Sequence, residues 1–323
     1  MPYRILSLDG GGIRGVFTTT LLERLEAAVP GFLGRVDLCA GTSTGGIIAL
    51  GLAAGLAPAD LTRLYLDRGP DIFPDSHLDG LEGLKKLIAA EYDNRSLKRI
   101  LEDTFARQDV ATLGELKRRV LIPTFDLDSL DRPGRAAAAP RTWKPKFFHN
   151  FDRDGDGDAR IVDVAMRTSA GPTYFPTYDG FVDGGVIANN PSMAALAQAI
   201  HPDTGRQRLE DVCLLSLGTG QRLRFIAGKD HNWGIIPWAP HLVNLMIEGG
   251  MDTARYQCQQ LLGERFCRVD AVLEREMDLD DVEDAAALVE RARALALEDA
   301  IGWLRHHFGP ASPLAPSRSS PTT

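Results

Sequence analysis

A serine framed by glycines is the first candidate for chemistry. Residues 41–45 read Gly-Thr-Ser-Thr-Gly, so Ser43 lies between Gly41 and Gly45. An apolar pattern typical of a strand precedes the segment, and an apolar helical pattern follows it. A nucleophile elbow needs this spacing, because its serine sits in a strained strand-to-helix turn that only small neighbours tolerate. The spacing therefore predicts that Ser43 is a nucleophile, although the same letters also occur by chance in turns.

A second glycine-rich turn, residues 9–15 (DGGGIRG), also lies between a strand pattern and a helix pattern. Consecutive glycines let the backbone approach a ligand and point several N–H groups at one spot, so this loop is suited to an anion. Gly10, Gly12 and Gly15 also match the dinucleotide-binding fingerprint, which makes an NAD(P)-binding protein an alternative. That fingerprint expects an acid at the end of the second strand, whereas Asp37 opens it.

Asp183 is the candidate base. It follows the short apolar run 180–182 and precedes two glycines that allow close approach, although an ordinary Asp-Gly turn would look the same. A serine nucleophile needs such a partner. No histidine lies in a glycine-framed motif, yet a Ser-His-Asp esterase with His231 or His241 as its base stays an alternative. The seven histidines are His77, His149, His201, His231, His241, His306 and His307.

Strand and helix patterns alternate along the chain and must position these residues. Strands are predicted at 4–8, 36–40, 120–125, 180–183, 212–217 and 266–269. Helices are predicted at 16–29, 45–54, 96–105 with Ser96 as N-cap, 163–168, 191–200, 240–262 and 281–307. This alternation predicts an α/β fold with a central, mostly parallel sheet that helices cover on both faces.

The three motifs, in this order, resemble the signatures of the patatin-like phospholipases. Residues 167–176 (RTSAGPTYFP), 189–191 (NNP) and 216–220 (SLGTG) are also similar to text that this family has at corresponding places. The resemblance covers roughly residues 3–305. It implies a three-layer α/β/α fold.

The resemblance also implies a mechanism without histidine. Ser43 would be the nucleophile and Asp183 the general base, and the oxyanion hole would be formed by N–H groups around Gly10, Gly11 and Gly12. The expected activity is a lipid acyl hydrolase of the phospholipase A or lysophospholipase type, acting through an acyl-enzyme and without a metal or cofactor. A silent lipid-binding protein is disfavoured, because serine, acid and glycine loop are all intact.

Two further features bear on the substrate. Arg14 beside the glycine loop either holds a lipid phosphate or pairs with a nearby acid. The segment from His231 to Ile247 has seventeen residues without a formal charge. We expect its Leu, Val and Met residues to pack in the core. We expect its Trp233–Trp238 portion, with Trp238 as a substrate-binding residue, to face a membrane or rim a pocket, which would give transient, peripheral membrane contact.

Residues 152–158 (DRDGDGD) resemble the first half of a calcium-binding EF-hand loop. Position twelve falls on Asp163, which is shorter than the usual glutamate. The favoured interpretation is a solvated acidic loop in which Asp163 caps the following helix, and a calcium site that stabilises the loop is the alternative.

Composition limits the remaining function classes. The chain has 323 residues and a net charge of −8, which argues against a nucleic-acid-binding surface. Four scattered cysteines and an N-terminus without a signal-like pattern indicate free thiols and a cytoplasmic location. We expect one domain at 3–308, an exposed insertion at 131–145 and a disordered Pro- and Ser-rich tail at 309–323. The oligomeric state is not indicated.

Overall fold

The computed structural model describes residues 2–72, 94–129, 140–152, 155–172, 174–221, 223, 225–228, 232–273 and 284–309. Most of the predicted insertion at 131–145 and all but the first residue of the predicted tail lie outside these ranges.

The described residues form a seven-stranded sheet in the order β4-β3-β2-β1-β6-β7, with β5 paired to β3. The neighbours from β3 to β7 along this order are parallel, and β4 and β5 run antiparallel to β3. The strands are β1 (Tyr3–Leu8), β2 (Leu38–Gly41), β3 (Arg119–Asp126), β4 (Lys144–His149), β5 (Phe181–Asp183), β6 (Val212–Leu217) and β7 (Phe266–Val269).

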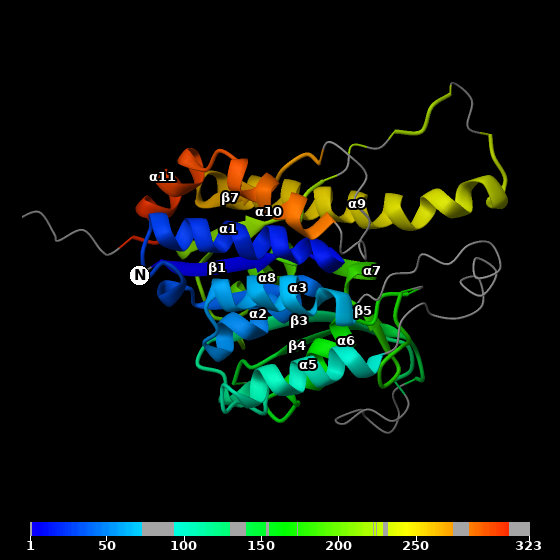
Figure 1. Ribbon diagram of the computed structural model, residues 1–323, viewed down its shortest axis with the longest axis horizontal. Coiled ribbons are helices and arrows are strands. Elements are labelled where there is room, and N and C mark those ends of the chain that lie inside the picture. The colour runs from blue at the N-terminus through cyan, green and yellow to red at the C-terminus, as the bar shows by residue number, and fades with distance from the viewer. Residues whose placement is uncertain are drawn as a thin grey trace, which may run out of the picture.

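Helices cover both faces of this sheet (Figure 1). They are α1 (Gly15–Ala28), α2 (Thr44–Ala54), α3 (Pro58–Ile72), α5 (Asn94–Ala106), α6 (Ile161–Thr168), α7 (Gly185–Ala188), α8 (Ser192–Ile200), α9 (Ile235–Leu262), α10 (Ala285–Ala294) and α11 (Glu298–His307). Successive side chains along a strand point to opposite faces of the sheet, so alternate residues pack against the helices on each face. Leu6 and Leu8 pack with α1 and α2, whereas Ile5 packs with α8 and α9. The predicted three-layer α/β/α fold is confirmed.

The sequence patterns mark six of these seven strands to within two residues, but they miss β4, α3 and α7. β4 begins with Lys144 and Pro145, which read as loop, and the proline is tolerated because β4 lies at the sheet edge. Three helix predictions need correction. Ser96 lies inside α5, and α9 begins at Ile235 rather than at residue 240. The predicted helix 281–307 breaks between α10 and α11, although the apolar pattern runs on through the break.

The amino-terminal half of α9 is not part of the core. Ala254, Cys258 and Leu262 on the other half are buried, whereas Leu242, Val243, Leu245 and Met246 are 41–69% exposed. The predicted core packing of these four residues is therefore wrong. Figure 1 shows this half of α9, in yellow, extending past the other helices at the end of the molecule where α7 lies. We call residues 235–247 the α9 arm.

Two other expectations concern thiols and membranes. All four cysteines are free, as predicted, and three of them are buried. Within the described ranges, no helix combines the length and apolar character that a bilayer crossing requires.

Candidate active site

Ser43 occupies the turn between β2 and α2 in a strained conformation. Its φ of 54° and ψ of −124° lie in a region that residues other than glycine rarely adopt. A Cβ on Gly41 would overlap the Gly45 carbonyl, and a Cβ on Gly45 would overlap the Leu8 carbonyl. Glycine is thus required on both sides of the serine by close backbone packing. The elbow geometry predicted from the spacing is present.

Asp183 reaches the elbow because two short strands share one edge of β3. β2 pairs with the first part of β3, ending at Ala40 opposite Leu121. β5 pairs with the last part, where Asp183 stands opposite Thr124. The other edge of β3 is occupied by β4. Asp183 therefore lies just beyond the end of β2, where the chain turns into Ser43.

The Asp183 carboxylate is buried and lies beside the serine. The Gly185 amide donates to its Oδ1 at 2.7 Å, and the Ser43 hydroxyl lies near enough to favour its charged form. Burial raises the pKa of this carboxyl to about 6, against the opposing effect of the Ser43 hydroxyl and the Gly185 amide. A carboxylate with a raised pKa is a stronger base, so the environment suits it to accept a proton near neutral pH.

The histidines in the described part of the chain contact groups other than Ser43 and Asp183. His149 contacts Phe151, His201 accepts from the Asp203 amide, and His241 lies against Trp233. His307 contacts Cys213, and His306 packs against His307. His77 and His231 lie outside the described residues. The geometry thus favours Ser43 with Asp183 over a Ser-His-Asp arrangement that uses His241.

The glycine loop lies against the serine, with one correction to the predicted oxyanion hole. A Cβ on Gly10 would overlap the Asn189 side chain and lie 3.3 Å from the Ser43 Cβ. The Gly10 amide, however, donates to the Asn189 carbonyl at 3.0 Å and is not available to a ligand. Among the described residues, the Gly11 and Gly12 amides have no acceptor, and Gly12 has a φ of +58°. Gly11 and Gly12 are the donors left to form an oxyanion hole.

Two supporting residues were not identified as functional from the sequence. Thr168 Oγ1 accepts from the Ser43 amide at 3.0 Å and donates to the Pro123 carbonyl at 2.7 Å, which fixes the elbow to β3. Asn189 binds both the amide and the carbonyl of Gly10. Both lie in segments that resemble family text, and that resemblance was the available signal.

The two predicted substrate contacts fall in different places. Arg14 is half-buried and donates to the carbonyls of Gly220 at 3.2 Å and Gly11 at 3.5 Å, so it braces the loop. Met251 on α9 marks the part of the helix nearest the glycine loop, because its sulfur accepts a hydrogen bond from the Asn189 side chain. Trp238 lies on the α9 arm, thirteen residues before Met251, or about 20 Å along the helix axis. Its ring contacts that of Trp233 in a tilted arrangement, at 5.3 Å between ring centroids. The structure therefore does not bring Trp238 to Ser43.

Two acids of the loop at 152–158 form ion pairs with basic side chains. Asp152 pairs with Arg119 at 2.6 Å, and Asp156 pairs with Lys146 at 2.5 Å. In the described part of the chain, no group of three or more His, Cys, Asp or Glu side chains could hold a metal, and Asp154 lies outside it. The predicted capping role of Asp163 is wrong, because this residue lies in the first turn of α6 and accepts from the Tyr178 hydroxyl.

The dinucleotide alternative fails on the position of its acid. Asp37 accepts from the Arg4 amide at 2.8 Å, at the ends where β1 and β2 begin. The glycine loop follows the opposite end of β1. Asp37 therefore cannot hold the ribose of a nucleotide bound at that loop.

A three-layer α/β/α fold, an elbow serine, a buried carboxylate beside it and a glycine loop with two amides that have no acceptor among the described residues are features of a hydrolase with a serine nucleophile. Residues 6–196 match the family model described as patatin-like phospholipase, and the chain belongs to this family.

Curated relatives agree with the family. The chain is 36% identical over 239 residues to a cGAMP-activated phospholipase of Escherichia coli, covering 67% of this chain and 62% of the relative. It is 31% identical over 338 residues to a cGAMP-activated phospholipase of Vibrio cholerae, covering 92% and 91%. It is 30% identical over 282 residues to patatin-like protein 2 of Arabidopsis thaliana, covering 73% and 65%. The matched part is thus less than two thirds of the first and third of these relatives.

Proposed function

We propose that this protein hydrolyses fatty-acyl esters of phospholipids with Ser43 as nucleophile and Asp183 as general base. The observation that carries the proposal is the buried Asp183 carboxylate just beyond the end of β2, beside the Ser43 elbow. We further propose that it acts in the cytoplasm, where its four free thiols would stay reduced.

In the first half-reaction, Ser43 Oγ bonds to the ester carbonyl carbon while Asp183 accepts the hydroxyl proton. The carbonyl oxygen becomes an oxyanion that the Gly11 and Gly12 amides stabilise, and each such donor is typically worth about 3 kcal/mol. The tetrahedral intermediate then collapses, and the ester C–O bond breaks. The departing alcohol or lysolipid takes the proton from Asp183, which leaves the fatty acid esterified to Ser43.

In the second half-reaction, water replaces the departed alcohol. Asp183 accepts a proton from the water while the water oxygen bonds to the acyl carbon. The oxyanion forms again at the same two amides. When the intermediate collapses, Ser43 Oγ leaves, recovers the proton from Asp183 and releases the fatty acid.

Arg14 is the cation that we propose for a lipid phosphate beside the glycine loop. Its guanidinium also donates to the Gly11 and Gly220 carbonyls. A substitution of Arg14 would therefore disturb the loop as well as the binding of a headgroup. Loss of activity in such a variant would not by itself identify a phosphate contact.

The α9 arm is the part of the surface that we propose meets the lipid. The arm adjoins the site, because Met251, four residues after the arm on α9, accepts a hydrogen bond from the Asn189 side chain at 3.0 Å. Ile235, Val243 and Met246 are 63–79% exposed, and residues 231–247 carry no formal charge in a chain of net charge −8. Trp233 and Trp238 border an apolar hollow of about 480 Å³, lined also by Ile235, Leu242 and Leu245. Tryptophan and aliphatic side chains of this kind favour a membrane interface.

Regulation by a cyclic dinucleotide is part of the proposal. Two relatives are named cGAMP-activated phospholipases, and one of them aligns with 92% of this chain. Assays therefore include cGAMP in one arm, so that a dormant enzyme is not mistaken for an inactive one.

Mass spectrometry of lipids released from defined vesicles tests the proposal. Wild-type protein should release free fatty acid and lysolipid, and Ser43→Ala should release neither. A fluorophosphonate probe should label the wild type and not Ser43→Ala. Absence of both release and labelling, with and without cGAMP, would refute the proposed function.

A further inference from the structure

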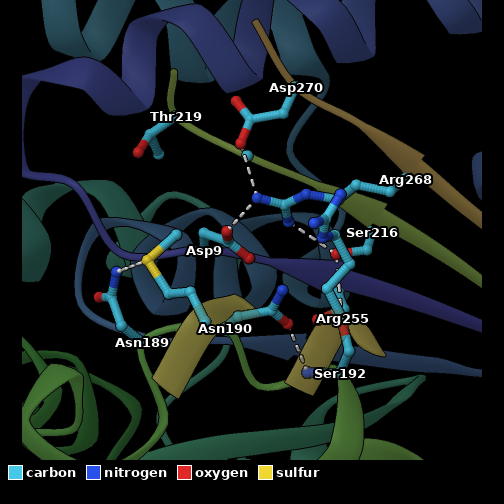
Figure 2. Close-up of polar contacts among 12 residues, drawn as sticks. Asp9, Asn189, Asn190, Ser192, Ser216, Thr219, Arg255, Arg268 and Asp270 are labelled. Atoms are coloured by element: carbon cyan, nitrogen blue, oxygen red, sulfur yellow. Dashed lines mark hydrogen bonds and ion pairs between the residues drawn. The ribbon is translucent and has the colours of Figure 1, made fainter. Parts of the chain in front are cut away.

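A buried arginine lies between two carboxylates next to the glycine loop. Arg268 on β7 donates through one terminal nitrogen to Asp9 at 2.6 Å and to Asp270 at 2.7 Å. Its other terminal nitrogen donates to Ser216 Oγ at 2.8 Å. Figure 2 shows this guanidinium between the two carboxylates. The Arg268 side chain is 11% exposed, and the Asp9 side chain is fully buried.

Strand register brings these groups together. Ser7, Ser216 and Arg268 are Cα partners in one row across the parallel strands β1, β6 and β7. Asp9 follows Ser7 by two residues, and Asp270 follows Arg268 by two. Since the side-chain period of a strand is two, the row and the acids beyond it point to one face of the sheet. Residues separated by more than 250 positions in the chain thus form one polar cluster.

The cluster is anchored on its far side by buried hydroxyls. The Ser192 hydroxyl, at the start of α8, lies 2.9 Å from Ser7 Oγ and 3.1 Å from Ser216 Oγ. All three serines are fully buried. Arg268 is therefore held by a rigid row of groups on three strands and one helix, which fixes the position of its guanidinium.

Two routes lead from Arg268 to the glycine loop. The first is covalent, because Asp9 is the residue from which Gly10 and the loop begin. The second passes through Asp270, whose Oδ1 accepts from the Gly220 amide at 2.9 Å. The neighbouring Thr219 hydroxyl donates to the Gly10 carbonyl at 3.1 Å. Both routes end at Gly10, the residue before Gly11 and Gly12, whose amides have no acceptor among the described residues.

Stability alone does not account for this cluster. A buried ion pair contributes little net stability, because desolvation of the charges offsets their attraction. In the described structure, Asp9 Oδ1 and Arg268 Nε are buried without a hydrogen-bond partner, which adds a cost. A cluster with this cost, placed at the start of a loop whose amide positions matter for chemistry, is better explained by the geometry that it imposes.

We propose that Arg268 is a positioning residue that fixes the oxyanion loop through Asp9 and Asp270. The inference rests on the proposed function, because it assigns the Gly11 and Gly12 amides to the developing oxyanion. Arg268 does not touch the substrate. It acts by holding Asp9 and the 218–220 turn at a fixed distance from each other, so that the two amides point to one place near Ser43.

Arg268→Lys tests this role. Lysine keeps the charge but lacks the planar fork that serves three acceptors, so the pairing geometry is lost while the buried charges stay compensated. We expect kcat to fall by at least about tenfold with KM within about twofold, because small displacements of transition-state donors affect kcat. The rate of fluorophosphonate labelling of Ser43 should fall in parallel, since the phosphoryl oxygen uses the same amides.

The matched control is Arg265→Lys. Arg265 donates to the carbonyls of Leu209 and Val212, at the opposite end of β6. We expect this variant to keep kcat and the labelling rate within about twofold. If Arg268→Lys labels and turns over at the wild-type rate, the positioning role is refuted while the proposed function stands. If its losses match only the fraction that thermal melting shows to be unfolded, the role is structural and the proposal is also refuted.

Asp270→Asn provides a second variant should Arg268→Lys fail to fold. Asparagine keeps an oxygen that can accept from the Gly220 amide but removes the charge that faces Arg268. We expect the same pattern with a smaller size: a several-fold loss in kcat and labelling rate, an unchanged KM and a normal melting temperature. Unchanged kcat in a folded Asp270→Asn protein would overturn the inference. If wild-type Ser43 is itself not labelled, the proposed function fails instead.

Discussion

Asp183 stands opposite Thr124 in the β3–β5 pairing, three residues beyond Leu121, the last β3 residue that β2 covers. This register puts a carboxylate at the open end of β2, where Ser43 turns into α2. The relationship explains how two residues 140 positions apart meet without a histidine between them. It also makes Asp183 the group whose removal is most informative.

Asp183→Asn should lower kcat on a short soluble ester by about 10² to 10⁴-fold, the usual range for loss of a general base. The asparagine keeps the size of the side chain and an acceptor for the Gly185 amide, so folding should be retained. His241→Gln serves as the control, because His241 is the described histidine that the Ser-His-Asp alternative would use. That alternative gains support only if His241→Gln abolishes turnover and Asp183→Asn does not.

The pH dependence of kcat/KM should show an acid limb near pH 6. Asp183 accepts a proton only when ionised, and burial raises its pKa to about 6. Activity should therefore fall about tenfold per pH unit below 6 and level off above it. Burial raises the pKa of Asp9 to about 6 as well, so the profile is repeated in Asp9→Asn. A limb that moves in that variant would assign the titration to Asp9.

The same raised pKa predicts that Asp183 destabilises the fold above pH 6. The folded state holds the proton more tightly than the unfolded chain, whose carboxyl has a pKa near 4. The contribution of this proton to the free energy of unfolding is thus fully present below pH 4 and is lost as the pH rises through 6. The loss is about 3 kcal/mol at most. Asp183→Asn removes this loss. Its melting temperature should exceed that of the wild type at pH 8 and match it at pH 4, and an equal difference at both pH values would contradict the burial effect.

The elbow glycines give a stability prediction with an internal control. A Cβ on Gly45 would overlap the backbone carbonyls of Leu8 and Asp9, which cannot move aside cheaply. Gly45→Ala should destabilise the protein by about 1–3 kcal/mol, the usual cost of overpacking. Gly302 lies inside α11, and a methyl group added to it would meet nothing within 4 Å, so Gly302→Ala should stabilise by up to about 1 kcal/mol. Chemical denaturation of both variants measures the contrast.

Local patterns were sufficient for the parts of the site that are encoded in short segments. Ser43 with Gly41 and Gly45, the glycine loop and Asp183 each lie in a short glycine-containing turn, and the order of the three turns along the chain made the resemblance specific. The use of the Gly10 amide by Asn189 is a contact across 179 residues, so no local signal shows that this donor is occupied. Oxyanion donors can be assigned only when tertiary hydrogen bonds are known.

Arg268 and the α9 arm show two other limits of sequence reasoning. Arg268 lies within the short strand pattern FCRV, and its importance depends on a register between three strands that are far apart in sequence. The arm has an apolar pattern similar to that of a buried helix, and the pattern does not tell which apolar stretch finds a neighbour. Packing of the other half of α9 against the sheet decides that the arm stays exposed.

The exposed arm predicts a separation of vesicle activity from soluble-ester activity. Val243→Asp with Met246→Asp places two charges on side chains that are 63% and 69% exposed, so the fold should be unaffected. A charge on a membrane-facing surface opposes burial at the interface, so hydrolysis of phosphatidylcholine vesicles should fall by at least about tenfold. Turnover of a short soluble ester should stay within about twofold. Trp238→Ala should show a weaker form of the same split.

Leu261→Asp is the matched control for the arm, because Leu261 is 42% exposed on the packed half of α9. It adds one charge to the same helix, where the arm variant adds two, and should leave vesicle hydrolysis within about twofold. Salt gives an independent check: the net charge of −8 repels anionic lipid, so binding to anionic vesicles should rise as salt screens that repulsion. Equal losses on vesicles and on the soluble ester would indicate damage to the site rather than a lost membrane contact. Loss of self-association in the arm variant, with vesicle binding intact, would instead assign the arm to a second copy of the chain.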